Sequence, residues 1–214
     1  MALTLPLERT AVVVIECQND LIHESHIGAR GIGGALAAAV QERGVLANIA
    51  AVLDAARAAG VPVLYANKES KPGMPTGNAP IYRIGKRIPI LQEGSPGANV
   101  HAAIAPRDGD VVIRRFLSID PSYGSGLFGT LRALGRSVMV AMGVSTNFAV
   151  EGTVRGAVNR SFEVVVPEDC CASIPEDMHR FSVERVLPVL ATVTRSADVV
   201  AALRTNASGG ADAP

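Results

Sequence analysis

The chain has 214 residues and a formal net charge of zero, with 20 lysine and arginine residues against 20 aspartate and glutamate residues. This length suits one domain with a substantial core, and a balanced charge without a dense basic run argues against nucleic acid or an anionic membrane as a partner. Three cysteines, two of them adjacent, cannot build a disulfide framework and lack zinc-site spacing. Because the sequence also shows no signal-peptide pattern or membrane span, we expect a cytoplasmic protein.

Short β-branched runs alternate along the chain with alanine- and leucine-rich stretches of helical period. The expected strands cover residues 11–15, 61–66, 110–113, 137–142 and 162–166, with a weak sixth near residues 191–194. Between the first two strands, Val45, Ile49 and Val52 follow the spacing of a helix that ends at Gly60. After the fourth strand, Thr146 is the expected N-cap of another helix. This alternation predicts an α/β domain in which helices cover a parallel sheet.

Two segments lack such patterns. Residues 68–106 are rich in glycine and proline, with turn signals and several basic side chains, and we expect them to form a lid over a site or an interface arm. Residues 205–214 have no apolar pattern and are expected to form a disordered tail, which leaves residues 1–204 as the domain.

Three segments carry a family resemblance when taken together. They read Val12-Val-Val-Ile-Glu-Cys-Gln-Asn-Asp20, Asp110-Val-Val-Ile-Arg-Arg115 and Gly143-Val-Ser-Thr-Asn-Phe-Ala-Val-Glu-Gly-Thr153. In order and spacing they resemble the isochorismatase-like hydrolases, a superfamily that includes nicotinamidases and N-carbamoylsarcosine amidohydrolases, over about residues 9 to 195. The resemblance implies a three-layer Rossmann-like domain with a six-stranded, mostly parallel sheet and a site at the carboxyl ends of the strands. It also implies a cis peptide near Val144–Ser145, and homodimers or homotetramers.

The same resemblance places three catalytic positions, and this chain differs at each. Glu16 stands where the family has an aspartate, Arg115 where it has a lysine, and Ala149 where it has the nucleophilic cysteine. Because Ala149 has no nucleophilic atom, the covalent thiol route is closed at this position. Glu16 can still act as a general acid or base, and Arg115, which cannot accept a proton, can hold an anion.

Further residues are candidates for substrate binding. Lys68 follows the second strand, where some isochorismatases contact substrate, although a lysine at a strand end is also compatible with simple solvation. Ser145 and Thr146 offer hydroxyl groups, but no histidine lies nearby in sequence to activate them. Free backbone N–H groups are expected from Asn147 to Val150 at a helix N-terminus, where a carboxylate or oxyanion can bind.

No cofactor or metal is expected. The run from Gly124 to Gly129 matches Gly-x-Gly-x-x-Gly, but it lies far from the preceding strand, which argues against a dinucleotide site. Residues 67–71 lack the Asp-x-His pattern by which nicotinamidase-type members bind metal. Cys17 should point away from Glu16 into a packed layer as an inert thiol. A fourth segment, Val164-Val-Val-Pro-Glu-Asp-Cys-Cys-Ala-Ser173, also resembles the family's fifth strand and the residues after it, which makes Cys171 an ordinary residue.

Two functions remain open. One is an isochorismatase-like hydrolase or lyase that acts on a small carboxylate-bearing, amide or enol-ether molecule by non-covalent acid–base chemistry, since isochorismatases themselves lack the cysteine. The other is a catalytically inactive pseudoenzyme with a ligand-binding or oligomer-forming role, in which Glu16 and Arg115 form a structural salt bridge.

Overall fold

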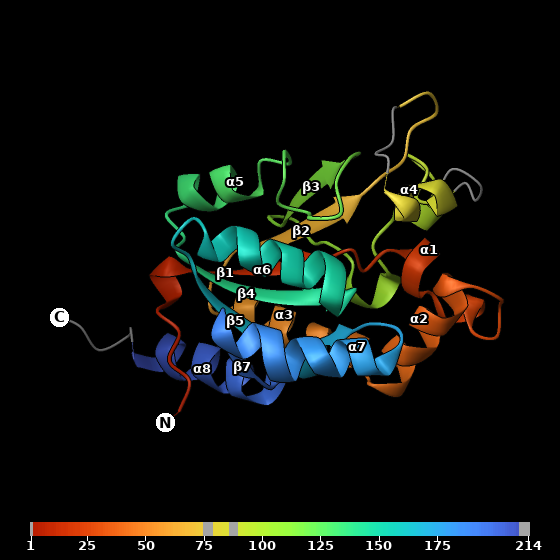
Figure 1. Ribbon diagram of the computed structural model, residues 1–214. Helices are drawn as coiled ribbons and strands as arrows, with labels where there is room; N and C mark the ends of the chain where they lie inside the picture. The colour runs from red at the N-terminus through yellow and green to blue at the C-terminus, as the bar shows by residue number, and fades with distance from the viewer. Residues whose placement is uncertain (1, 75–78, 86–89, 210–214) are drawn as a thin grey trace.

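The computed structural model describes residues 2–74, 79–85 and 90–209. Its centre is a parallel sheet with the strand order β3-β2-β1-β4-β5-β7 (Figure 1). A short seventh strand, β6, pairs with β4. The strands are β1 Thr10–Ile15, β2 Val63–Lys68, β3 Val111–Arg115, β4 Val138–Val144, β5 Glu163–Pro167, β6 Cys171–Ala172 and β7 Thr192–Thr194. All six predicted strands are present, and β6 is the addition.

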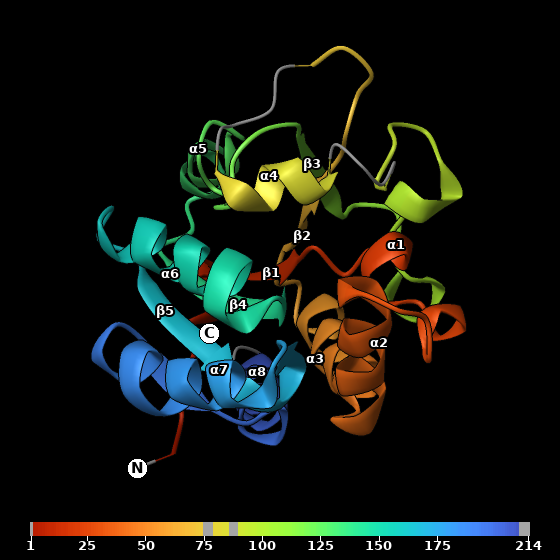
Figure 2. The same ribbon diagram turned by 45° about the vertical axis from the view of Figure 1, so that its right-hand side comes forward.

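Helices cover both faces of this sheet, because its central strands are apolar on both faces and must be buried on both. Residues of β1 alternate between two hydrophobic clusters, with Val12 and Val14 in one and Val13 and Ile15 in the other. The first cluster includes buried side chains from α2 Ile32–Glu42, α3 Val45–Ala58 and α8 Ser196–Gly209. The second includes buried side chains from α5 Leu127–Ala133 and α6 Glu151–Val158. Figure 2 shows α6 on one side of β1 and β4, with α2 and α3 on the other. The result is the predicted three-layer α/β architecture.

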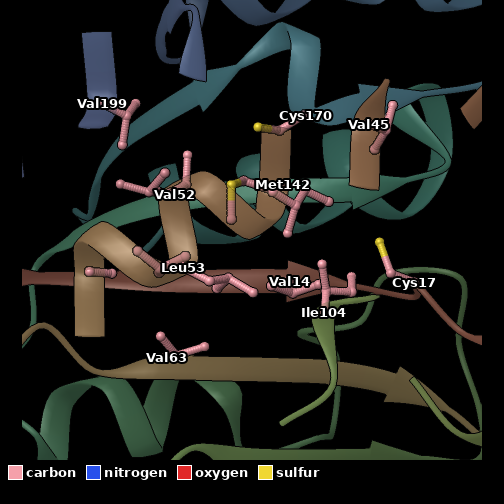
Figure 3. Close-up of a cluster of buried hydrophobic side chains, with 14 of the residues drawn as sticks. Val14, Cys17, Val45, Val52, Leu53, Val63, Ile104, Met142, Cys170 and Val199 are labelled. Carbon is pink, nitrogen blue, oxygen red and sulfur yellow. The ribbon is translucent and has the colours of Figure 1, made fainter. Parts of the chain in front are cut away.

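The cluster on the α3 side contains Cys17, whose side chain is fully buried near Val14 and Ile104 (Figure 3). This placement confirms that Cys17 points into a packed layer. Burial raises the pKa of the Cys17, Cys170 and Cys171 thiols, so all three remain protonated and unreactive in the folded chain.

Several boundaries differ from the sequence patterns. Helix α8 runs to Gly209 and therefore includes residues 205–209 of the expected tail, whereas residues 210–214 lie outside the described residues. The segment 68–106 contains the short helix α4 Pro80–Gly85 and two 3₁₀ turns, Pro96–Ala98 and Ala102–Ile104. The cis peptide implied by the resemblance is present at Val144–Ser145.

Among the described residues, no single helix is both long and apolar enough to cross a membrane. The pair Gly33–Glu42 and Val45–Ala58 passes the same length and composition criteria only when its two helices, bent by 63°, are taken together.

Candidate active site

The three predicted catalytic positions, Glu16, Arg115 and Ala149, lie at the carboxyl-terminal edge of the sheet. Glu16 directly follows β1 in a left-handed conformation (φ 51°), and its backbone N–H donates to the Ala66 carbonyl at 3.2 Å. Arg115 is the last residue of β3, and Ala149 lies in a π-helical turn, Thr146–Val150, that follows β4. Because β1, β3 and β4 are parallel, their carboxyl ends share one edge, which is where open α/β sheets bind ligands.

Glu16 and Arg115 are in direct contact. Nη2 of Arg115 donates to Oε1 of Glu16 and also to the Ile119 carbonyl at 3.2 Å. The Arg115 side chain is only 3% exposed and that of Glu16 13%. Nε and Nη1 of Arg115 are buried without a hydrogen-bond partner among the described residues. A buried cation with unsatisfied N–H groups strongly favours an added acceptor, because each unpaired group costs roughly 1–3 kcal/mol.

Lys68 lies beside this ion pair. It ends β2, and its Cα is the register partner of the Arg115 Cα in the parallel β2–β3 pair. Its ammonium lies 5.5 Å from the ring centroid of Tyr82, on α4, so the described part of the segment 68–106 borders the site. Burial and the neighbouring charge of Arg115 lower the pKa of Lys68, and the Glu16 carboxylate opposes this shift only in part.

Gln18 fixes the backbone of Lys68, a role that the sequence analysis missed. Its fully buried carboxamide donates from Nε2 to the carbonyls of Lys68 and Ala98, at 2.7 Å each, and accepts the Lys68 N–H at 2.8 Å on Oε1. The next two residues hold the same neighbouring segment: Asn19 donates to the Pro96 carbonyl at 2.8 Å, and Asp20 accepts the Leu91 N–H at 2.5 Å. The run of three polar residues that begins three positions after the end of a buried strand was the available signal.

The π-helical turn corrects two predictions. Thr146 is not an N-cap: the cap position is Ser145, which makes no side-chain capping bond, and Thr146 Oγ1 bonds instead to Nδ1 of His179 at 2.8 Å. The N–H groups of Phe148 and Val150 both donate to the Ser145 carbonyl, at 3.1 and 3.2 Å. They are therefore not free, and Val150, whose side chain is fully buried, loses its basis as a substrate contact.

The predicted residue Asn147 also has a structural partner, because its Oδ1 accepts a hydrogen bond from Ser173 Oγ. Further along the chain, Ser182 Oγ donates to Glu151 Oε2 at 2.6 Å. Together with the contact between His179 and Thr146, three side chains of the segment 173–182 hold residues 146–151 in place.

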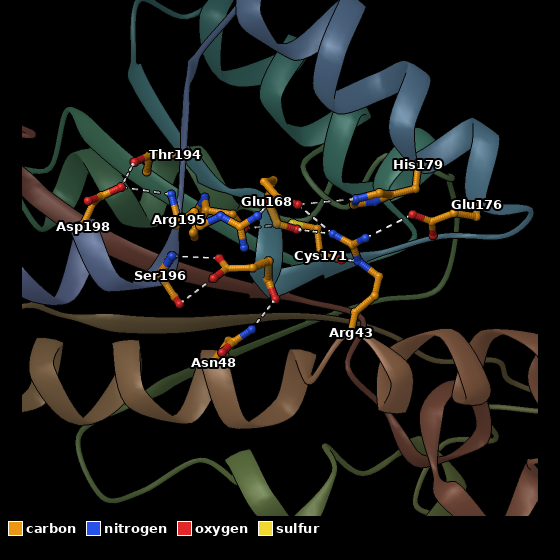
Figure 4. A network of polar contacts seen from close by, with 12 residues as sticks. Arg43, Asn48, Glu168, Cys171, Glu176, His179, Thr194, Arg195, Ser196 and Asp198 are labelled. Carbon is orange, nitrogen blue, oxygen red and sulfur yellow. Dashed lines mark hydrogen bonds and ion pairs between the residues drawn. The ribbon is translucent and has the colours of Figure 1, made fainter.

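His179 is a residue of this region that the sequence did not reveal, because it lies 33 residues from Thr146. It lies on α7 Glu176–Phe181, is 1% exposed, and its Nε2 lies 3.8 Å from Glu168 Oε2 without a hydrogen-bond partner in the described part of the chain. Burial and the charge of Arg43, opposed by Glu176, lower the pKa of His179 to about 4, so the ring is neutral near pH 7. Figure 4 shows Arg43 between Glu168 and Glu176, which it binds at 2.7 and 3.1 Å.

One group of possible metal ligands lies apart from these residues. Ligand atoms of His23, Glu24 and His101 lie within 4.8 Å of one another. Nδ1 of His101 accepts the Ala103 N–H at 3.2 Å, which leaves the proton on Nε2, where it points at Glu24 Oε2 at 2.9 Å. A hydrogen bond between His101 and Glu24 therefore accounts for the contact, and His101 does not offer a lone pair to a cation.

An open parallel sheet with helices on both faces defines a Rossmann-like α/β domain, and the buried charged cluster at its carboxyl edge is its candidate ligand site. The family model that describes the Isochorismatase domain matches residues 10–198, so the chain belongs to the isochorismatase family.

Curated relatives and solved structures agree with this assignment. The chain is 29% identical to the ureidoacrylate amidohydrolase RutB of Agrobacterium fabrum, over 92% of this chain and 92% of that protein. It is 30% identical to RutB of Rhizobium rhizogenes, over 89% and 83%. A cysteine hydrolase from Pseudomonas syringae superposes with a TM-score of 0.80 at 26% identity, covering 95% of this chain and 96% of that one. An N-carbamoylsarcosine amidase from Thermoplasma acidophilum superposes with a TM-score of 0.70 at 27% identity, covering 88% and 96%.

Proposed function

We propose that this chain hydrolyses an amide-type C–N bond in a small carboxylate-bearing molecule, by acid–base chemistry that uses no thiol nucleophile. The observation that carries the proposal is the buried guanidinium of Arg115, which contacts Glu16 through one nitrogen while Nε and Nη1 have no hydrogen-bond partner in the described part of the chain. A planar guanidinium fork with free N–H groups matches the geometry of a carboxylate.

The charge balance supports an anionic ligand. Arg115 and Lys68 contribute two positive charges and Glu16 one negative charge, and the pKa of Lys68 is lowered because its ammonium is poorly solvated there. A carboxylate bound at Arg115 would compensate the excess positive charge, and this interaction is stronger in a site of low dielectric than in water.

The proposed chemistry relies on Glu16. Its carboxylate takes a proton from a water molecule as the water oxygen attacks the substrate carbonyl carbon, so that no covalent intermediate forms at Ala149. The relatives support a C–N bond as the target, since they are named for ureidoacrylate amidohydrolysis and as an N-carbamoylsarcosine amidase. An enol ether is the second substrate class to test, because isochorismatases resemble this chain in lacking the cysteine.

One structural feature favours the alternative of a pseudoenzyme. The two side chains at the acid and cation positions bind each other directly, and Ala149 packs into the hydrophobic cluster on the α6 side. A binding protein could keep this fold and use Arg115 only to hold a ligand, without turnover.

A substrate panel with matched variants separates the two functions. Purified protein would be assayed for ammonia release from ureidoacrylate and N-carbamoyl amino acids, with the corresponding amides lacking a carboxylate as controls. An enol-ether carboxylate, the second class, would be assayed for release of its carbonyl product, because its hydrolysis yields no ammonia. Arg114 is the matched control for Arg115, because it is the adjacent residue but is 61% exposed and pairs with Glu69. Hydrolysis that is lost in Glu16→Gln and Arg115→Met but kept in Arg114→Met supports the proposal, whereas full activity of Glu16→Gln refutes its mechanism. Carboxylate binding without turnover, measured by calorimetry, identifies a pseudoenzyme.

We further infer that the chain is cytoplasmic and assembles as a homodimer or homotetramer. Three free, buried cysteines suit a reducing compartment. Phe148 and Phe181, 47% and 58% exposed, come from the π-helical turn and from α7, two elements that contact each other, and covering them is a reason for a second copy to bind. Light scattering on the purified protein tests the assembly, and a monomeric mass refutes it.

A further inference from the structure

The chain contains only three lysines, Lys68, Lys71 and Lys86, and all fall within one stretch of 19 residues in the segment 68–106. Lys86 lies outside the described residues. The position at which the family resemblance places a lysine carries Arg115 instead, and Lys68 is its Cα register partner on the neighbouring strand. An amine is therefore still present at this edge of the sheet, but it comes from β2.

Strand geometry directs this amine to the face of the sheet that contains Ala149. Ala66 and Ile113, which precede Lys68 and Arg115 by two residues, both belong to the hydrophobic cluster on the α6 side, as Ala149 does. Because side chains two residues apart in a strand share a face, Lys68 and Arg115 leave the sheet on this same side.

Lys68 is also held more firmly than a solvated lysine at a strand end. Its N–H and carbonyl are both bound by the buried Gln18 carboxamide, and its ammonium lies 5.5 Å from the Tyr82 ring centroid. The charged groups that act on it are Arg115, at the end of β3, and Glu16, after β1. The side chain is thus fixed at its base and flanked by both charged residues of the site.

We propose that Lys68 is the general acid of this site and protonates the leaving nitrogen. This inference rests on the hydrolytic function proposed above. Glu16 takes a proton from water, the water oxygen forms a bond to the carbonyl carbon, and the C–N bond breaks with its electron pair moving to nitrogen. The Lys68 ammonium supplies the proton that this nitrogen needs. Proton transfer from the Glu16 carboxyl to the Lys68 amine then restores both groups.

The chemistry of the neighbouring residues supports this assignment. Arg115 remains protonated at any relevant pH and cannot supply the proton. Lys68 can, and because burial and Arg115 lower its pKa, its ammonium is a stronger acid than that of an ordinary lysine. A carboxylate acting as base beside an amine acting as acid is a complementary pair for a hydrolysis without a covalent intermediate.

A titration of the lysines tests the premise without any substrate. The protein would be reductively methylated with ¹³C-formaldehyde, and the Lys68 and Lys71 signals assigned by Lys68→Arg and Lys71→Arg. Lys71 is the matched control, 52% exposed and 3.2 Å from Glu93. We expect Lys68 to titrate at lower pH than Lys71, Arg115→Met to raise the Lys68 midpoint, and Glu16→Gln to lower it. A Lys68 midpoint that equals that of Lys71, or that does not respond to Arg115→Met, overturns the proposal.

Kinetics test the role itself on the substrate found in the panel. Lys68→Arg keeps the charge but is too weak an acid, so kcat should fall on the order of a hundredfold or more, while Lys71→Arg keeps the wild-type kcat. The alkaline decline of kcat should also disappear in Lys68→Arg. An unchanged kcat and pH profile in Lys68→Arg overturns the role of Lys68 but leaves the proposed hydrolase intact, because Glu16→Gln and Arg115→Met would still abolish activity. A wild-type chain that hydrolyses no member of the panel overturns both.

Discussion

Replacing Gln18 by methionine should destabilise the protein by more than the loss of one hydrogen bond would. The substitution keeps the volume of a fully buried residue but removes three hydrogen bonds, two to the Lys68 backbone and one to the Ala98 carbonyl. Three backbone groups lose their partner, and each buried unsatisfied group costs roughly 1–3 kcal/mol. Allowing for partial relaxation, we expect the free energy of unfolding to fall by about 3–6 kcal/mol.

Urea denaturation followed by circular dichroism measures this loss, with an unchanged m-value as evidence that the folded state stays compact. Asn19→Ala is the control, since it removes one exposed bond to the Pro96 carbonyl and should cost only about 0.5–1.5 kcal/mol. A Gln18→Met protein within about 1 kcal/mol of wild type, near the net worth of a single hydrogen bond, would show that the clamp on Lys68 is dispensable and would refute the reasoning.

Three further predictions follow from the site and the turn beside it. The pKa of His179 is lowered from 6.5 to about 4 in the folded chain, so between these pH values the unfolded chain binds a proton that the folded chain does not. The free energy of unfolding is therefore fully present above about pH 6.5 and falls by on the order of 3 kcal/mol as the pH drops towards 4. His179→Gln should flatten the dependence of the urea midpoint on pH over this range, and an unchanged profile contradicts the assignment. Ala149→Cys should leave the folded protein unlabelled by iodoacetamide, because Ala149 is only 2% exposed and the three native cysteines are buried as well. Mass spectrometry detects any adduct, and alkylation of the introduced thiol would contradict this and show that the position opens to small molecules. Arg115→Met should cost about 1–3 kcal/mol, less than the usual loss for breaking a buried ion pair, because it removes two unsatisfied nitrogens along with the partner of Glu16. Arg107→Met, at a pair with Asp54 whose side chains are 62% and 61% exposed, should stay below about 1 kcal/mol, and equal losses in the two variants would contradict the burial argument.

The fold was predictable because its signal is local. Runs such as residues 11–15 are apolar throughout since both faces of the sheet are covered, and the stop at Gly60 follows from its positive φ of 66°. The end of α8 was not predictable in the same way. Residues 205–209 have no apolar pattern, but they continue a helix whose earlier turns bury Val199 and Leu203.

The sequence predicts those parts of the candidate site whose positions follow from the parallel arrangement of the strands. Glu16 and Arg115 each lie at the carboxyl end of a parallel strand, so both reach the same edge of the sheet. Locating the two strands in the sequence is therefore enough to expect these side chains near each other. The partner of Thr146 is different, because His179 is 33 residues away and reaches it only through the packing of α7 against the turn. The N–H groups of Phe148 and Val150, two of the backbone amides expected to be free, were misjudged for a related reason. A regular α-helix would leave its first N–H groups free, whereas the π-helical turn directs those of Phe148 and Val150 to the Ser145 carbonyl.

The replacements that we infer from the family resemblance, Glu16 for an aspartate and Arg115 for a lysine, change the length of the side chains as well as their chemistry. Glutamate is longer than aspartate and arginine longer than lysine, and in this chain Glu16 and Arg115 meet in a direct ion pair. On this interpretation a carboxylate that accepts a thiol proton in a thiol-dependent hydrolase would have no such proton to accept beside Ala149, so the ion pair does not compete with that step. The pair neutralises one cation and leaves the unpartnered Arg115 nitrogens and Lys68 as excess positive charge. Such a site favours a substrate that supplies its own anion, and it separates two tasks. Arg115 should determine how tightly the anion binds, and Lys68 should determine how fast the bond breaks.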